Sequence, residues 1–155
     1  MPKLEVSYQK ALKLTNVLMI DVPIESLGNF PVVVEQMENY IKTKGFQPIG
    51  PLIQYNAIAG QGEDATVLIR LMRQCSGYIN HVEKPYAIES VLRVPHCMYV
   101  RFNGDSDRIQ MGYNKLTLTA YEENIPLRGD SYTVFVSGDD EIVTADIFMP
   151  RTDLD

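Results

Sequence analysis

The stretch Val17-Leu18-Met19-Ile20-Asp21-Val22 opens the pattern that decides the predicted fold. Apolar residues at helical spacing follow from Phe30 to Lys44, and a second β-type stretch runs through Ile49-Gly50-Pro51-Leu52-Ile53-Gln54-Tyr55. Apolar residues three and four apart predict an amphipathic helix, and short apolar or alternating stretches predict strands. From Ala65 to Cys75 strand and short helix both fit the spacing. We prefer a strand, which completes a β-α-β-β module.

The same order returns in the second half of the chain. The stretch Cys97-Met98-Tyr99-Val100-Arg101-Phe102 precedes a predicted helix from Ser106 to Glu123, whose apolar stripe is Ile109, Tyr113, Leu116 and Ala120. Strands at Tyr132–Val136 and Ile142–Met149 then form a closing hairpin. The predicted fold class is α+β, with two pseudo-symmetric β-α-β-β modules and an antiparallel sheet. Such halves bury their apolar faces by packing together, which predicts a central cleft.

Local signals place the ends of the first helix. Asn29 is a residue type that caps helix N-termini, and Pro31 stands where a missing N–H group costs nothing. Gly45 suits the left-handed conformation that commonly ends a helix.

Other signals predict breaks in the strands. Residues 4–22 read as one or two strands interrupted near Leu14-Thr15-Asn16. Pro95 is expected to end a strand that runs from Tyr86 to Val94, and residues 60–64 are expected to form a turn. We therefore predict one domain over residues 1–155, with half-modules at about 1–77 and 86–150 and a linker at about 78–85.

Composition narrows the classes of partner and the compartment. The formal net charge of −6 and the absence of a Lys/Arg cluster argue against direct binding of nucleic acid. No apolar run approaches the roughly 18 residues of a membrane helix, and no signal peptide is visible. The two cysteines, Cys75 and Cys97, are outside any C-x-x-C arrangement. We expect a cytoplasmic protein that contacts no membrane.

Two motifs carry a resemblance to a known family. They are Gly50-Pro51 followed by Tyr55, and the terminal Asp146-Ile147-Phe148-Met149-Pro150. In this order, and with the paired modules, the chain resembles the GyrI-like family, the bacterial effector-binding domains of AraC- and MerR-type regulators and of free-standing proteins. The resemblance implies two modules around a cleft that binds small, often cationic or aromatic, molecules. With 155 residues and no attached helix-turn-helix region, we expect a stand-alone member.

One departure from the family concerns a carboxylate. Members that bind cationic drugs typically carry a glutamate two residues before an aromatic residue on the middle strand of the second half. Here Thr133 precedes Phe135 at that place. Without a buried carboxylate, both cation binding and the hydrolysis known for some members lose their expected anchor. Glu89 is the candidate replacement if the face of its strand opposite Ile88 lines the cleft, whereas Glu35 is expected on a solvated flank of the first helix.

A cleft for a flat ligand would need amphipathic rings and a polar anchor. The candidate ligand-binding residues are Tyr55, Glu89, Tyr99, Tyr113, Tyr132 and Phe135. For each tyrosine, core packing with the hydroxyl at the surface is the alternative role.

The sequence offers no catalytic motif and no metal site. His81 and His96 are the only histidines, and no phosphate-binding loop or nucleophile elbow is present. We therefore expect no cofactor and leave enzymatic activity open, with a non-enzyme preferred. Three functions remain. They are small-molecule binding, protein interaction or inhibition of the gyrase-inhibitor type with a protein partner or homodimer, and hydrolysis by a pocket carboxylate and tyrosine.

Overall fold

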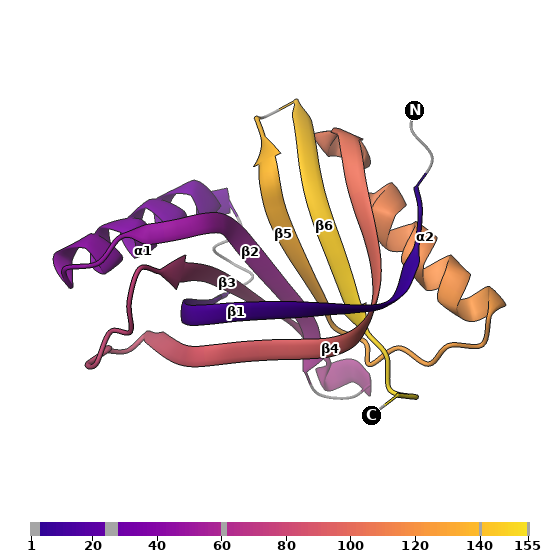
Figure 1. Cartoon of the computed structure of the whole chain (residues 1–155), viewed down its shortest axis with the longest axis horizontal. Coiled ribbons are helices and arrows are strands. Elements are labelled where there is room, and N and C mark those ends of the chain that lie inside the picture. The colour runs from indigo at the N-terminus through magenta and orange to yellow at the C-terminus, as the bar shows by residue number, and fades with distance from the viewer. Residues whose placement is uncertain (1–3, 24–27, 60–61, 140, 155) are drawn as a thin grey trace. The chain divides into compact units, whose positions relative to one another are not determined.

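A computed structural model describes residues 4–23, 28–59, 62–139 and 141–154 (Figure 1). The strands within these ranges are β1 (Ser7–Val22), β2 (Pro48–Ala59), β3 (Thr66–Cys75), β4 (Tyr86–Asp105), β5 (Ser131–Gly138) and β6 (Ile142–Pro150). The helices are α1 (Phe30–Thr43) and α2 (Gln110–Glu122). The strand pairs β1–β3, β2–β3, β4–β6 and β5–β6 are all antiparallel, which confirms an α+β fold with antiparallel pairing.

The chain divides into two compact units. The central unit is Lys13–Leu92, and the terminal unit joins Met1–Leu12 to Arg93–Asp155. Strands β1 and β4, of 16 and 20 residues, are long enough to contribute to both units. No helix in the described ranges is long and apolar enough to cross a membrane.

The predicted breaks in β1 and β4 are wrong, because each strand absorbs its irregularity at a single residue. Asn16 has a φ of 51° within β1, and His96 has a φ of 57° within β4, directly after Pro95. Asparagine and histidine are the non-glycine residues, with aspartate, that enter this left-handed region most readily. A strand therefore continues through both positions.

The central unit packs α1 against the sheet β1–β3–β2. Met37 and Ile41 of α1 are fully buried with Leu18 and Leu71, which confirms the predicted apolar stripe. The α-helix begins at Phe30 beside Pro31, as predicted, but Asn29 makes no side-chain capping hydrogen bond, so that part of the prediction is wrong.

The structure also bears on the predictions for the end of α1 and for the segments that follow it. Gly45 has a φ of 87° and follows Lys44, the C-cap residue of α1, in agreement with its predicted role. Strand β3 confirms the preference for a strand at residues 65–75. Of the predicted turn at residues 60–64, Gly60 and Gln61 lie outside the described residues, and Gly62–Asp64 forms a 3₁₀ turn. Residues 76–85 contain no strand or helix.

The terminal unit packs α2 against one face of the sheet β4–β6–β5 (Figure 1). Leu116 and Ala120 of α2 are buried with Phe102 and Ile147, while Ile109 and Tyr113 pack at the edge of this core. The α-helix starts later than predicted, because Ser106–Arg108 forms a 3₁₀ turn before it. The predicted hairpin of β5 and β6 is confirmed.

Candidate ligand-binding faces

The first candidate face is the side of the central sheet that points away from α1. Ile20 and Leu71 point toward α1 and its core, so their neighbours Asp21 and Arg70 point to the opposite side. Asp21 is opposite Arg70, and Arg70 is opposite Tyr55. The three side chains therefore form one row across β1, β3 and β2.

An ion pair and a ring contact hold this row. Arg70 Nε donates a hydrogen bond of 2.6 Å to Oδ1 of Asp21, and the Arg70 guanidinium lies 5.6 Å from the centre of the Tyr55 ring. The side chain of Asp21 is 54% exposed and that of Arg70 is 31% exposed. Both charges are therefore accessible to a ligand.

Glu89 joins the same face from β4. Tyr86 and Ile88 pack against the α1 core, which places Ala87 and Glu89 on the side away from α1. Glu89 is exposed and lines a pocket of about 260 Å³ with Met19, Asp21, Arg70, Pro85 and Ala87. Within the described part of the chain no salt bridge involves Glu89, whereas Asp21 is paired with Arg70. Glu89 is thus the carboxylate of this pocket with the most accessible charge.

The second candidate face is the side of the terminal sheet that points away from α2. Phe148 of β6 is opposite Tyr99 of β4 and opposite Tyr132 of β5. The rings of Tyr99 and Phe148 lie 5.0 Å apart in a tilted arrangement, and Lys10 Nζ lies 5.3 Å from the centre of the Tyr99 ring. Phe148 and Tyr132 are each only 7% exposed. The row is an aromatic strip with a cation above one end.

A carboxylate network borders this strip. The Tyr99 hydroxyl donates a hydrogen bond of 2.7 Å to Oδ1 of Asp146, and Arg101 donates to both carboxylate oxygens at 2.7 and 3.0 Å. Burial alone would raise the pKa of Asp146, but these hydrogen bonds outweigh it and hold the pKa below its ordinary value. Burial and the negative charge of Asp146 raise the pKa of Tyr99 to about 12. At neutral pH the pair is therefore a phenol and a carboxylate.

Two of the predicted site residues lie on the other side of this sheet. Phe135 packs against the α2 core, and Tyr113 of α2 packs there as well. The Tyr113 hydroxyl shares a hydrogen bond with Thr133, which is 1% exposed. Burial raises the pKa of Tyr113. The structure thus brings Tyr99 and Tyr132 onto one face, Tyr55 and Glu89 onto another, and leaves Tyr113 and Phe135 beside α2.

Sequence reasoning missed Asp21, Arg70, Arg101 and Asp146. Their signal is the alternation of a strand, because each lies between apolar residues of the opposite face, as Asp146 does between Ala145 and Ile147. A charged residue within such a stretch marks the side away from the helix. Which arginine pairs with which aspartate depends on strand register, which the sequence does not encode locally.

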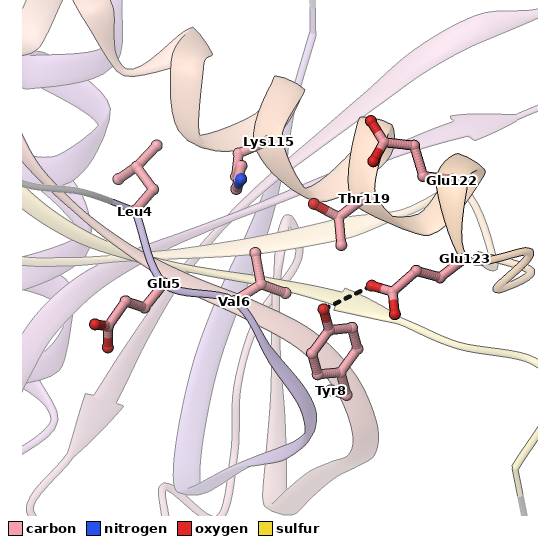
Figure 2. A pocket seen from close by; sticks show the side chains of 8 residues that line it. All are labelled: Leu4, Glu5, Val6, Tyr8, Lys115, Thr119, Glu122 and Glu123. Atoms are coloured by element: carbon pink, nitrogen blue, oxygen red, sulfur yellow. Dashed lines mark hydrogen bonds between the residues drawn. The ribbon is translucent and has the colours of Figure 1, made fainter.

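A wider and more polar pocket lies between the N-terminal segment and α2 (Figure 2). It has a volume of about 510 Å³ and is lined by Leu4, Glu5, Val6, Tyr8, Lys115, Thr119, Glu122 and Glu123. The Tyr8 hydroxyl donates a hydrogen bond of 2.6 Å to Glu123 across it. None of the predicted site residues lines this pocket, and its open rim gives a ligand little enclosure.

Neither cysteine is placed for chemistry. Cys75 and Cys97 are free and buried, and burial raises the pKa of both thiols, that of Cys97 to about 11. A thiol with a raised pKa is a poor nucleophile. In the described ranges no three His, Cys, Asp or Glu side chains form a group suited to a metal ion.

No protein-family model and no curated protein sequence matches the chain. Solved structures do match it over nearly its full length. EcmrR, in a complex with DNA, has a TM-score of 0.68 at 10% identity, and the match covers 97% of this chain. SAV2435 bound to tetraphenylphosphonium has a TM-score of 0.57 at 9% identity, over 98% of this chain and 95% of that one. The chain therefore shares the fold of these structures, which is the fold that the GyrI-like resemblance predicts.

A third structure with this GyrI-like fold is a proposed bacterial transcription regulation protein from Staphylococcus aureus MU50. It has a TM-score of 0.52 at 12% identity, over 93% of this chain and 97% of that one. By contrast, the match spans only 58% of the EcmrR chain. The resemblance predicted from the sequence is confirmed at the level of the fold.

Proposed function

We propose that this chain binds a small organic molecule with an aromatic body and a cationic group. The observation that carries the proposal is the fold shared with SAV2435, whose structure contains tetraphenylphosphonium, over 98% of this chain. Tetraphenylphosphonium combines four aromatic rings with one positive charge. A ligand of this class needs aromatic surface and an accessible carboxylate.

Both requirements are met on the faces that point away from the helices. The central face presents the half-buried ring of Tyr55 and the exposed carboxylate of Glu89. On the terminal face Tyr99 is half-buried, whereas Phe148 and Tyr132 are buried, so the accessible aromatic surface there is that of Tyr99. Thr133 stands where cation-binding members of the family carry a glutamate, and in this proposal Glu89 supplies the missing negative charge. Formal net charge of −6 adds a general attraction for cations.

The finer prediction, a cleft between two pseudo-symmetric half-modules at about 1–77 and 86–150, belongs to the same proposal. If one ligand is held there, residues from both halves are needed for a single binding event. Tyr55→Ala and Tyr99→Ala, which each remove an aromatic ring, should then each weaken binding of the same ligand with unchanged stoichiometry. Calorimetric titration measures both quantities, and loss of affinity in only one of the two variants would restrict the site to one half.

The test of the function is a thermal-shift titration with tetraphenylphosphonium and a panel of aromatic cations. A ligand at one hundred times its Kd stabilises a protein by roughly 2.7 kcal/mol, which is a clear shift in melting temperature for a domain of this size. Glu89→Gln should weaken binding, whereas Glu35→Gln, which removes the same charge from an exposed position on α1, should not. An unchanged melting temperature across the panel would overturn the proposal.

Hydrolysis has less support than binding. A carboxyl group that serves as a general acid at neutral pH needs a raised pKa. Asp146, the carboxylate bonded to a tyrosine on the terminal face, has a lowered pKa. This network is therefore better suited to positioning a ligand than to transferring a proton to it.

A further inference from the structure

The pocket that contains Glu89 is too small to enclose a whole aromatic cation. Its volume is about 260 Å³, whereas pockets that enclose a drug-sized ligand measure roughly 300–1,000 Å³. None of the described residues that line it is aromatic, and they are Met19, Asp21, Arg70, Pro85, Ala87 and Glu89. The pocket therefore suits the charged group of a ligand, whose aromatic body would lie outside it.

Two carboxylate groups in this pocket have oxygen atoms open to a hydrogen-bond donor. Arg70 Nε donates a hydrogen bond of 2.6 Å to Oδ1 of Asp21, but Arg70 Nη2 lies 3.4 Å from Oδ2, which is a long and weak hydrogen bond. Glu89 is exposed, and in the ranges that the structure describes its carboxylate forms no salt bridge. Each carboxylate oxygen has two lone pairs, so Asp21 Oδ2 and both oxygens of Glu89 can accept hydrogen bonds from a ligand.

A ligand that enters the pocket has to replace the water around these oxygens. Covering a charged acceptor without giving it a hydrogen bond costs free energy. Quaternary ammonium and phosphonium ions have no N–H group, so they attract the carboxylates by charge alone. A primary ammonium group carries three N–H donors on a compact centre and can replace the lost water.

The charges that line the pocket also favour a compact cation. Asp21 and Glu89 are negative and Arg70 is positive, so the lining carries one net negative charge. Because Arg70 is paired with Asp21, Glu89 is the main partner for a ligand. Arg70 repels any cation nearby, and a compact ammonium group offsets this repulsion by approaching Glu89 more closely than a charge surrounded by four phenyl rings can.

We propose that this pocket selects a protonated primary amine joined to an aromatic body, and that it discriminates against quaternary ammonium and phosphonium ions. This inference rests on the proposed function and specifies the chemical class of its ligand. Glu89 accepts a charge-assisted hydrogen bond from the ammonium group, and Oδ2 of Asp21 accepts a second one.

Two opposing effects set the size of the preference. The hydrogen bonds to carboxylates strengthen binding of the primary ammonium group, whereas its stronger hydration has to be given up on entry. Solvent also weakens ionic contacts with exposed side chains such as Glu89. We therefore expect the primary amine to bind about tenfold more tightly than its quaternary counterpart.

NMR titration of the full chain at pH 7 with two matched probes tests the proposal. The probes are 2-phenylethylammonium and its N,N,N-trimethyl derivative, which share one aromatic ring and one positive charge. The primary ammonium probe should bind about tenfold more tightly and should shift the amide signals of Asp21, Arg70 and Glu89.

Three variants connect this preference to the pocket. Glu89→Gln should reduce the preference to about threefold or less, because the charge and one acceptor oxygen are lost. Glu35→Gln, which removes the same charge from an exposed position of α1, should leave the preference unchanged. Ala87→Leu fills the pocket without changing its charge and should weaken the primary ammonium probe at least about fivefold. Ala87 is exposed, so this substitution is compatible with the fold.

The outcomes separate this inference from the proposed function. If aromatic cations bind but the quaternary probe binds as tightly as the primary one, the inference is overturned and the proposed function stands. A preference that persists in Glu89→Gln, or a primary probe that binds Ala87→Leu unchanged, would overturn the inference as well. If neither the two probes nor tetraphenylphosphonium binds, the proposed function fails and the inference fails with it.

Discussion

Gly112 of α2 lies so close to Ile147 of β6 that a Cβ atom at Gly112 would come within 2.7 Å of the Ile147 Cδ1 atom. The same Cβ atom would lie 3.5 Å from Cβ of Phe102, at an ordinary contact distance. Gly112 is the third residue of α2, and a glycine within a helix costs up to about 1 kcal/mol relative to alanine. Its presence here is explained by the close approach of α2 to the sheet.

The effect of a Gly112 substitution on the free energy of unfolding should therefore depend on the size of the side chain at position 147. Gly112→Ala alone should destabilise the protein by about 1–2 kcal/mol, because overpacking outweighs the gain in helix propensity. In an Ile147→Val background, which lacks the Cδ1 atom, the same change should be neutral or stabilising. Urea unfolding of the four proteins in this double-mutant cycle measures the coupling. Equal costs of Gly112→Ala in both backgrounds would contradict the close contact as its cause.

The titration of Tyr99 should respond to Asp146. The pKa of Tyr99 is raised to about 12 first by burial and then by the hydrogen bond to Asp146. In Asp146→Asn the negative charge is lost but the burial remains, so the pKa should fall toward, yet stay above, the ordinary value near 10. Carbon NMR of the tyrosine rings, with Tyr99→Phe for assignment, measures it. The pKa of Tyr113, which is raised by burial on the other side of the sheet, should not move.

Asp146 should also stabilise the protein in a pH-dependent manner. Its pKa in the folded state is below the unfolded value near 3.9, so its stabilisation is complete above the unfolded pKa and is lost as the pH falls through the folded one. Asp146→Asn should cost about 1–2 kcal/mol at pH 7, a modest value because the Arg101 side chain is 54% exposed. Unfolding free energies at pH 7 and pH 3 should show that this difference shrinks in acid. A constant difference would show that the carboxylate charge is not responsible.

Much of the fold could be predicted from the sequence because its signals are local. The spacing of Met37 and Ile41 predicts α1, and the apolar stretch at Thr66–Cys75 predicts β3. The predicted breaks at Asn16 and Pro95 failed for a physical reason. One residue with a positive φ bends a strand locally, and the strand then resumes its pairing.

The candidate site could be predicted in part. Residues an odd number of positions apart on a regular strand point to opposite faces, so the separation of Tyr132 and Phe135 already places them on different sides of β5. The row of Asp21, Arg70 and Tyr55 could not be predicted, because it is created by the register between strands distant in sequence. From the sequence, the role of Glu89 depended on which face of its strand lines a cleft. In the structure Ile88 packs against the α1 core, and Glu89 is exposed on the opposite side.

The proposed preference for cations should be limited by Arg70, the positive charge in the pocket that contains Asp21 and Glu89. Arg70→Met removes this charge and frees Asp21 from its ion pair. At a distance of about 6 Å, a unit charge contributes roughly 0.7–1.4 kcal/mol in a largely solvated site, so affinity for tetraphenylphosphonium should rise about three- to tenfold at low salt. Added salt should diminish the gain, because the charges are exposed to screening.

Lys42→Met, which removes an equal charge from an exposed position of α1 on the other side of the sheet, is the control and should change affinity little. Calorimetric titration of the original protein and the two variants measures the affinity for tetraphenylphosphonium. An equally large gain in affinity in Lys42→Met would assign the effect to net charge instead of to this pocket.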